Sequence, residues 1–326
     1  MYTLSEAQVR RLLDPSKTVA ALEETFRRDY HATVCMPARL RCDISSRGVL
    51  LTMPCYDSAL PALGVKLVSF IQNQLEGSER LQATYVLLDP NTGKPQALLA
   101  ANYLTHIRTA ATSAVATKFL GRTDARTLGI FGTGCQARAH IAVLRTIQQF
   151  ERILVCGSRP ERSKEFSQQL AAEQGVQVQP VDARTCVRES EVLCTCTTST
   201  EPLFDGNWLR PGTHLNLVGT FHPDTREVDD ITIKRARVVL DTLEGGLSEA
   251  GDLLIPLKRG IVGREHIVAD LHEIVSGKKV GRRSPQEITL FKSVGCALED
   301  LVAATLVYEE ALRQGLWAES QQEANR

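Results

Sequence analysis

The feature that most restricts how this chain can fold is a glycine turn between a strand and a helix. Residues 127–131 (TLGIF) are apolar and β-prone, and they lead directly into residues 132–137 (GTGCQA), after which apolar residues recur at helical spacing. A strand that turns through two closely spaced glycines into a helix is typical of the first βα unit of a Rossmann-type sheet. The sequence therefore predicts an α/β fold with a doubly wound parallel sheet.

The residues of this turn suit the binding of a dinucleotide pyrophosphate. Gly132 permits the tight turn, Gly134 lets the backbone approach the phosphates, and Ala137 allows the helix to pack closely on the strand. The N-terminus of the helix that follows offers unpaired N–H groups and a positive dipole end. We expect these three residues, with Thr133 and Gln136, to contact the dinucleotide. The alternative is an ordinary turn of an α/β fold, which uses glycines but binds no nucleotide.

The tip of the next strand predicts which dinucleotide is bound. Sites for NAD usually place an acidic residue there, about twenty residues after the glycines, against the ribose hydroxyls. Here the strand ends in CGSRPER (156–162). Ser158 can hydrogen-bond a 2′-phosphate, and Arg159 and Arg162 can pair with it. We therefore predict NADPH, with NADH as the alternative if both arginines are only solvated.

The region before the glycine turn has a different pattern. Residues 4–29 and 102–120 have apolar side chains at helical spacing. Between them, short β-prone runs are separated by turns, which indicates an antiparallel or mixed sheet. We expect its strands at 48–53, 64–70, 83–88 and 95–100.

From about residue 121, strands alternate with helices, as in a parallel sheet built from βαβ units. The expected strands are 127–131, 152–156, 176–181, 192–197, 214–218 and 238–241, with helices at 136–149, 160–174 and 185–190. Residues 284–314 are predicted to return to helix and to dock on the first region. The chain thus predicts two domains, residues 1–120 plus 300–326 and residues 121–299.

Composition excludes several classes of protein. Lys plus Arg and Asp plus Glu both total 38, so a net charge of zero gives no general attraction to nucleic acid or to anionic membrane. No apolar run is long enough to span a bilayer, and the charged N-terminus does not resemble a signal peptide. Nine cysteines, an odd number and mostly in apolar runs, indicate reduced thiols. We expect a cytoplasmic protein without a metal site.

Five further motifs resemble the ornithine cyclodeaminase/μ-crystallin family. They are GVK (64–66), LTHIRTAA (104–111), PGTHLN (211–216), EAGD (249–252) and ITLFKSVG (288–295). The resemblance implies an α+β substrate and dimerisation domain, completed by the C-terminal helix, around an inserted Rossmann domain. It also implies a homodimer, whose interface we expect at unpaired strand edges, and a small α-amino or imino acid bound beside the nicotinamide.

The resemblance assigns the substrate carboxylate to two arginines. Arg108 lies in the motif LTHIRTAA, and its planar guanidinium can grip a carboxylate in two places. Arg39 (in PAR, 37–39) matches the family's second carboxylate contact, although Arg41 would face the same side of a strand. The alternative for Arg108 is a position on a helix surface.

Lys66 is the predicted catalytic residue and a substrate contact. It lies within the apolar run LGVKLVSF (63–70), where burial would lower the pKa of its ammonium and suit it to donate a proton. The alternative is that the ammonium reaches water. The resemblance places the matching lysine beside the substrate, and it adds Thr84 (in QAT, 82–84) to the pocket.

One position departs from the family's pattern. Cyclodeaminases and alanine dehydrogenases have an aspartate shortly after the Val-Gly pair that follows Asn216. This aspartate accepts and donates protons at the substrate amine. Here the stretch is VGTFHP (218–223), and Phe221 takes that place. Reduction of a preformed, protonated imine has less need of such a base, and the stretch looks more like that of pyrroline-2-carboxylate reductases. His222 or Asp224 could substitute for the missing group.

Three more residues are expected to contact the dinucleotide. Thr197 and Val218 lie at the ends of expected strands of the Rossmann domain, and Lys292 belongs to a family motif near the nicotinamide. The sequence and the resemblance together predict an NAD(P)H-dependent reductase. Its substrate would be a cyclic ketimine carboxylate, Δ1-pyrroline-2-carboxylate or Δ1-piperideine-2-carboxylate, and its product L-proline or L-pipecolate. The alternatives are an ornithine cyclodeaminase, an alanine dehydrogenase-like enzyme, and a non-catalytic binding protein.

Overall fold

The computed structural model describes residues 1–44, 48–71 and 81–316. The chain divides into two compact units. The first consists of Met1–Thr25, Asp29–Arg108 and Cys296–Arg326, and the second of Phe26–Arg28 and Thr109–Gly295. Each unit has its own sheet.

The first unit is built on a mixed sheet whose strands follow the order β1-β7-β6-β5-β4-β2, with β3 beside β4. The pairs among β4 to β7 are antiparallel, and β1 runs parallel to β7. The antiparallel or mixed sheet expected from the sequence is therefore confirmed. The elements are β1 (Tyr2–Leu4), α1 (Glu6–Leu12), α2 (Pro15–Arg27), β2 (Val34–Cys35), β3 (Leu40–Ile44), β4 (Gly48–Asp57), β5 (Ala62–Ile71), β6 (Leu81–Leu88), β7 (Pro95–Ala100), α3 (Asn102–Leu120) and α11 (Ala297–Arg313). The end of α2 from Phe26 and the part of α3 from Thr109 belong to the second unit.

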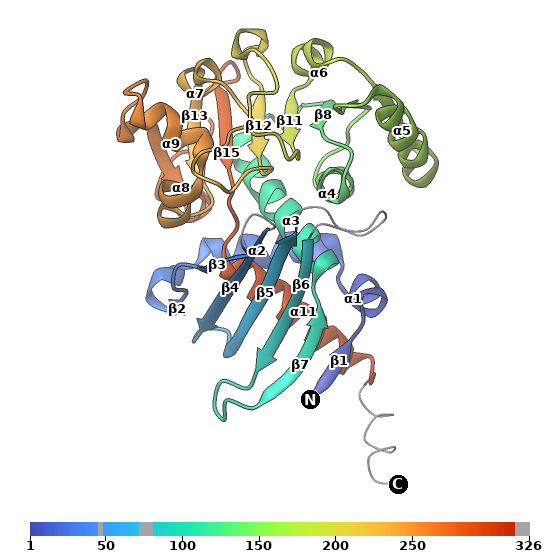
Figure 1. The fold of residues 1–326 in the computed structure, drawn as a ribbon, viewed down its shortest axis with the longest axis vertical. Helices are drawn as coiled ribbons and strands as arrows, with labels where there is room; N and C mark the ends of the chain where they lie inside the picture. Colours follow the sequence, from blue (N-terminus) through green and yellow to red (C-terminus); the bar gives the residue numbers. More distant parts are fainter. Residues whose placement is uncertain (45–47, 72–80, 317–326) are drawn as a thin grey trace. The chain divides into compact units, whose positions relative to one another are not determined.

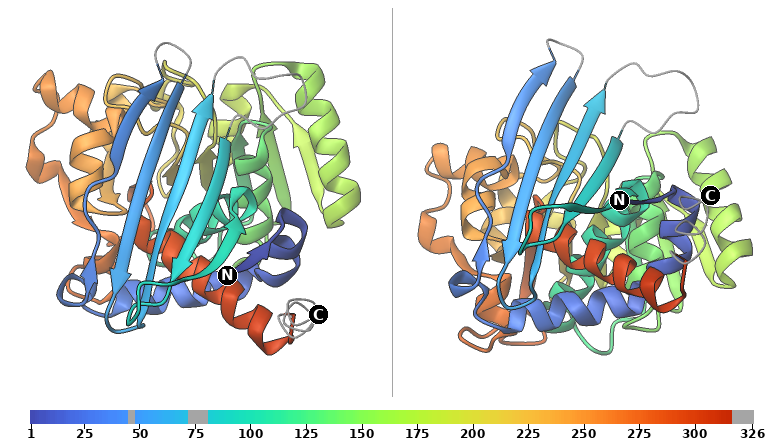
Figure 2. Two further views of the ribbon diagram at one scale, coloured as in Figure 1. Left: turned by 60° about the horizontal axis from the view of Figure 1, so that its bottom comes forward. Right: turned by 90° about the horizontal axis from the view of Figure 1, so that it is seen from below.

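The two faces of this sheet differ in burial. Along β5, residues 62, 64, 66 and 68 are buried, whereas residues 63, 65, 67 and 69 are at least partly exposed. Helix α11 packs on the buried face, where it contacts β4, β5 and β6 (Figure 1). Figure 2 shows α11 beside these strands in two further views. Because side chains alternate along a strand, every second residue of β5 faces this helix.

The second unit is a parallel sheet of order β10-β9-β8-β11-β12-β15-β13-β14 with flanking helices (Figure 1). The predicted Rossmann-type α/β fold is confirmed. The strand order reverses between β8 and β11, which is where such sheets bind their ligands. The elements are β8 (Thr127–Phe131), α4 (Cys135–Leu144), β9 (Arg152–Cys156), α5 (Pro160–Gln174), β10 (Gln177–Pro180), α6 (Ala183–Glu189), β11 (Val192–Thr195), β12 (His214–Leu217), α7 (Asp230–Arg235), β13 (Ala236–Leu240), α8 (Leu243–Glu249), α9 (Gly251–Lys258), β14 (Ile267–Asp270), α10 (Leu271–Val275) and β15 (Ile288–Lys292).

The prediction that residues 284–314 form helix throughout is wrong for its first part. Residues 288–292 are strand β15, which pairs with β12 on one side and β13 on the other. All five residues are buried. A strand covered on both faces has a continuous apolar run, which periodicity cannot distinguish from buried helix. The helix begins only at Ala297.

Two expectations from composition concern the whole chain. The nine cysteines are free thiols. Among the residues that the structure describes, no helix combines the length and the apolar character that crossing a membrane requires.

Candidate functional site

Lys66 lies at the centre of a buried group of charges in the first unit. Its position in β5 places it on the face that α11 covers, and its side chain is 1% exposed. Its ammonium nitrogen lies 2.8 Å from Oδ1 and 2.7 Å from Oδ2 of Asp300, in the first turn of α11. The alternative that this ammonium reaches water is therefore wrong.

The environment of Lys66 changes its proton affinity. Burial lowers the pKa of Lys66 to about 8, and the positive charge of Arg108 contributes to this shift. The carboxylate of Asp300 opposes it, since an adjacent negative charge favours the ammonium form. Near neutral pH the lysine is thus mostly protonated, yet it can exchange its proton more readily than an exposed lysine.

Arg108, near the middle of α3, belongs to the same group. Its Nη1 lies 2.5 Å from Oε2 of Glu299, and its Nε lies 2.8 Å from Oδ1 of Asp300. Burial lowers the pKa of Arg108, but the two carboxylates outweigh burial and the net shift is upward. Two cations and two anions therefore balance within a region from which water is largely excluded. We call Lys66, Arg108, Glu299 and Asp300 the charge cluster.

The structure places the other two predicted substrate residues differently. Arg39, just before β3, is half-buried, and its charge is among those that lower the pKa of Lys66. Thr84 in β6 pairs with Leu67, whereas Lys66 pairs with Tyr85. Because paired residues share a face of the sheet, Thr84 points to the face opposite Lys66. Arg39 thus lies near the charge cluster, and Thr84 does not.

The glycine turn of the second unit has the geometry that a pyrophosphate requires. Gly132 has φ +113°, and a Cβ there would lie 2.5 Å from the carbonyl oxygen of Cys196, so only glycine fits. Gly134 is the N-cap of α4, and a Cβ there would meet no protein atom within 4 Å. Space is therefore open beside the helix N-terminus. Ala137 is fully buried, as close packing of helix on strand demands.

The three residues predicted to contact the ribose follow β9, with Ser158 and Arg159 in the turn and Arg162 in the first turn of α5. Ser158, Arg159 and Arg162 are all exposed. Arg159 is also the N-cap of α5. Within the described part of the chain, neither arginine pairs with a carboxylate. Both guanidinium groups can therefore take an external anion.

A buried carboxylate ties together the strand ends on the other side of the switch point. Glu227 accepts hydrogen bonds at Oε1 from the backbone N–H (2.9 Å) and the hydroxyl (2.7 Å) of Thr197. At Oε2 it accepts from the hydroxyl of Thr195 (2.6 Å) and the backbone N–H of Gly219 (2.8 Å). Burial raises the pKa of Glu227. Val218 joins the same edge through its N–H, which donates to Thr195 O at 3.1 Å.

Lys292 is a second buried lysine. Its ammonium lies 2.9 Å from Oδ2 of Asp252 and donates to the carbonyl oxygen of Thr220 at 2.6 Å. Oδ1 of Asp252 accepts from the backbone N–H groups of Glu227 (2.7 Å) and Val228 (3.2 Å). Lys292 thus connects the end of β15 with the loop after β12.

Sequence reasoning missed the acidic partners of both lysines. Glu299 and Asp300 lie in a stretch whose amphipathic pattern assigns acids to solvent, yet both are fully buried. Glu227 lies in a loop without a motif. The one signal in the sequence is the motif EAGD (249–252), whose last residue is Asp252.

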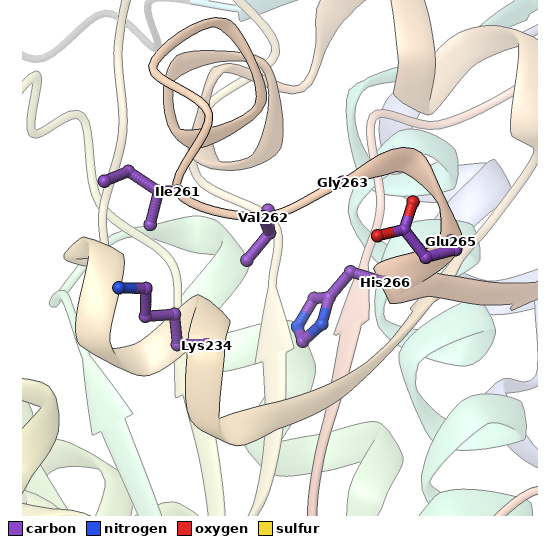
Figure 3. A pocket seen from close by; sticks show the side chains of 6 residues that line it. All are labelled: Lys234, Ile261, Val262, Gly263, Glu265 and His266. Carbon is purple, nitrogen blue, oxygen red and sulfur yellow. The ribbon is translucent and has the colours of Figure 1, made fainter.

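The loop that contains Phe221, at the position that the resemblance aligns with an aspartate, is less buried. Phe221 packs, partly buried, against the core of the second unit. The side chains of His222 and Asp224 are 46% and 75% exposed, with Nδ1 and Oδ2 3.9 Å apart. A surface hollow elsewhere in this unit contains none of the predicted site residues (Figure 3). It is lined by Lys234, Ile261, Val262, Gly263, Glu265 and His266.

Comparison with known proteins agrees with this geometry. Residues 1–315 match the model of the ornithine cyclodeaminase/mu-crystallin family. The chain belongs to this family. A relative from Bacillus cereus named Δ1-pyrroline-2-carboxylate reductase is 38% identical over 275 residues, which cover 83% of this chain and 84% of the relative.

Two solved structures superpose closely on this chain. One is a Δ1-pyrroline-2-carboxylate reductase from Thermococcus litoralis in complex with NADH and L-proline (TM-score 0.94, 38% identity, covering 97% of this chain and 98% of that one). Another is an archaeal alanine dehydrogenase dimer with bound NAD (TM-score 0.91, 30% identity, 97% of each chain). Two proteins that are named for different reactions thus share this fold.

The contacts of Lys292 predict a structural role that can be measured. Lys292→Met leaves Asp252 buried without its cation, so we expect the free energy of unfolding to fall by about 3–5 kcal/mol in urea denaturation. Lys258→Met removes an exposed lysine of the same unit and should change it by less than about 0.5 kcal/mol. Equal free energies of unfolding in the two variants would show that the ion pair of Lys292 with Asp252 does not stabilise the unit.

Proposed function

We propose that this protein is an NAD(P)H-dependent reductase of a cyclic ketimine carboxylate, Δ1-pyrroline-2-carboxylate or Δ1-piperideine-2-carboxylate, with L-proline or L-pipecolate as product. The observation that supports this most is the likeness, over 97% of the chain, to a reductase whose structure contains NADH and L-proline. The charge cluster adds a chemical reason, because it holds a lysine with a lowered pKa beside a buried arginine.

In this proposal the first unit binds and protonates the substrate. Arg108 binds the substrate carboxylate together with Arg39, which fixes the orientation of the ring. Lys66 donates a proton to the imine nitrogen, or a hydrogen bond to the iminium, since its pKa of about 8 leaves it charged near neutral pH. Thr84 keeps its predicted pocket role only if the substrate site reaches the opposite face of the sheet.

The second unit binds the dinucleotide, which supplies the hydride. Gly132, Thr133, Gly134, Gln136 and Ala137 form the pyrophosphate turn, and the open space beside Gly134 fits such a group. The positive end of α4 attracts the phosphates.

The strand ends beyond the switch point complete the proposed dinucleotide site. Thr197 and Val218 contact the nicotinamide half from the ends of β11 and β12. Glu227 fixes the hydroxyl of Thr197, so this residue offers a rigid surface. Lys292 holds the loop after β12 through its hydrogen bond to the carbonyl oxygen of Thr220.

The activity can be measured as oxidation of NADPH with Δ1-pyrroline-2-carboxylate. We expect the protein to oxidise NADPH when the cyclic imine is the only other substrate. In Lys66→Met, kcat/KM should decrease at least about 100-fold, because the proton donor is lost. Lys94→Met, which removes an exposed lysine of the same unit, should retain the activity. Full activity in Lys66→Met would eliminate this lysine as a catalytic residue.

Parallel substrates distinguish the alternatives. Oxidation that requires pyruvate and ammonia would indicate an alanine dehydrogenase, and ammonia release from ornithine without net cofactor turnover would indicate a cyclodeaminase. Binding of NADPH and imino acid without any turnover would indicate a binding protein. Each of these results contradicts the proposed reduction.

We further propose that NADPH is preferred over NADH. The exposed arginines at the tip of β9 support this, because a 2′-phosphate would supply the anion that they can bind. Replacing Arg159 and Arg162 by alanine should lower the ratio of kcat/KM for NADPH to that for NADH by about 10-fold or more. Arg264→Ala, an exposed arginine of the same unit, should leave the ratio unchanged. Equal kcat/KM values in the unaltered protein contradict the preference.

We also propose a homodimer formed through the partly exposed face of the first sheet rather than through its edges. This face presents Leu63, Val65 and Leu67, the last with 39% of its surface exposed. Leu67→Glu would place a charge in this interface, so light scattering should show monomers. Leu60→Glu, at a more exposed leucine (46%) in the turn before β5, should remain dimeric. A dimer of Leu67→Glu would show that the interface lies elsewhere.

A further inference from the structure

Asp300 is distinguished from its neighbour Glu299 by what it contacts. Both of its carboxylate oxygens lie within 2.8 Å of the Lys66 ammonium, and Oδ1 also lies 2.8 Å from Nε of Arg108. Glu299 forms an ion pair with Nη1 of Arg108. Consecutive residues on one helical turn thus present two buried carboxylates with different partners. Asp300 joins the two cations, and Glu299 holds one of them.

We propose that Asp300 is a positioning residue for the reduction: it holds the Lys66 ammonium in place and keeps it protonated, whereas Glu299 orients Arg108. This inference rests on the function proposed above. Asp300 acts through Lys66 and has no direct role at the reacting atoms.

The surroundings of Lys66 show why the lysine depends on this one carboxylate. The groups that face it are Arg108 from α3, Arg39 from the segment before β3, Tyr85 from β6 and Asp300 from α11. Arg108 and Arg39 both repel its positive charge, and Tyr85 is neutral because burial raises the pKa of its phenol well above the usual value. Asp300 is therefore the anion in direct contact with the lysine.

The rest of the cluster does not replace Asp300. Oε2 of Glu299 lies 2.5 Å from Nη1 of Arg108. Cys296, the N-cap of α11, and Cys55 of β4 also lie near the cluster, where each affects the pKa of a neighbour, Arg108 and Tyr85 respectively. Without Asp300, a buried ammonium would face two cations, so it would lose its proton at a lower pH.

The two carboxylates provide a matched pair of variants, Asp300→Asn and Glu299→Gln. Each removes one negative charge from the same turn of α11 with little change of shape. Donation of a proton requires charged Lys66, so kcat/KM for the imino acid should decline above the pKa of Lys66. We expect Asp300→Asn to move this decline about 1–3 pH units toward lower pH and to reduce kcat. Glu299→Gln should raise KM and leave the decline in place.

The pH profiles can overturn the proposal in two ways. If the profile of Asp300→Asn keeps the decline of the unaltered protein, Asp300 does not control Lys66. If both variants shift the decline equally, the effect is a general loss of buried charge. Asp300→Glu is the second variant, in case Asp300→Asn does not fold. Asp300→Glu keeps the negative charge but moves it along the longer side chain. We therefore expect kcat to fall while kcat/KM declines at the same pH as in the unaltered protein. A rise in KM without a change in kcat would contradict positioning of Lys66.

A measurement without substrate separates this inference from the proposed function. In protein labelled with 13C at lysine Cε, the resonance absent from Lys66→Met reports the protonation of Lys66. It should titrate at lower pH in Asp300→Asn than in Glu299→Gln and the unaltered protein. If the titration shift is present but the protein does not reduce the imine, the proposed reductase function is wrong and the control of Lys66 by Asp300 stands. If the protein reduces the imine but shows no titration shift, only the control of Lys66 by Asp300 is wrong.

Discussion

The placement of two cations beneath a helix is the constraint on which the first unit depends. A buried ammonium or guanidinium is costly unless a carboxylate lies in contact with it. The first turn of α11 supplies two carboxylates at consecutive positions, Glu299 and Asp300. The charge cluster therefore ties a segment near the end of the chain to β5 and α3. The same contacts that hold these elements together also set the charge state of the groups proposed to bind the substrate.

The second unit uses the same principle at the carboxyl edge of its sheet. Lys292 is neutralised by Asp252, whose other oxygen accepts two backbone N–H groups at the start of the segment from Glu227. Glu227 in turn fixes the ends of β11 and β12. Loops at this edge of a parallel sheet usually bind the ligand and must keep their shape. Buried charge here supplies rigidity in place of regular secondary structure.

The extent to which the fold could be predicted depends on how local the signal is. The strand at Thr127–Phe131 and the helix at Asn102–Leu120 were predicted at their observed bounds, since a glycine turn and a long periodic run are local patterns. Strand β15 was predicted as helix, because its neighbours β12 and β13 come from elsewhere in the chain. For the candidate site, the burial of Lys66 followed from its apolar flanks. Its partner Asp300 did not, because 234 residues separate them.

Charge balance connects the site to the kind of substrate proposed for it. A protonated cyclic imino carboxylate has no net charge, and neither has the charge cluster, so their encounter leaves no charge unbalanced in a buried region. Ornithine has an additional ammonium group, and the position that the family resemblance aligns with a proton-handling aspartate holds Phe221, packed against apolar residues. Reduction of an imine requires a group that protonates the nitrogen or donates a hydrogen bond to it, whereas a base is required to deprotonate an amine. The chain offers a buried ammonium at Lys66 and an aromatic ring where the carboxylate would be, and this combination favours the reduction.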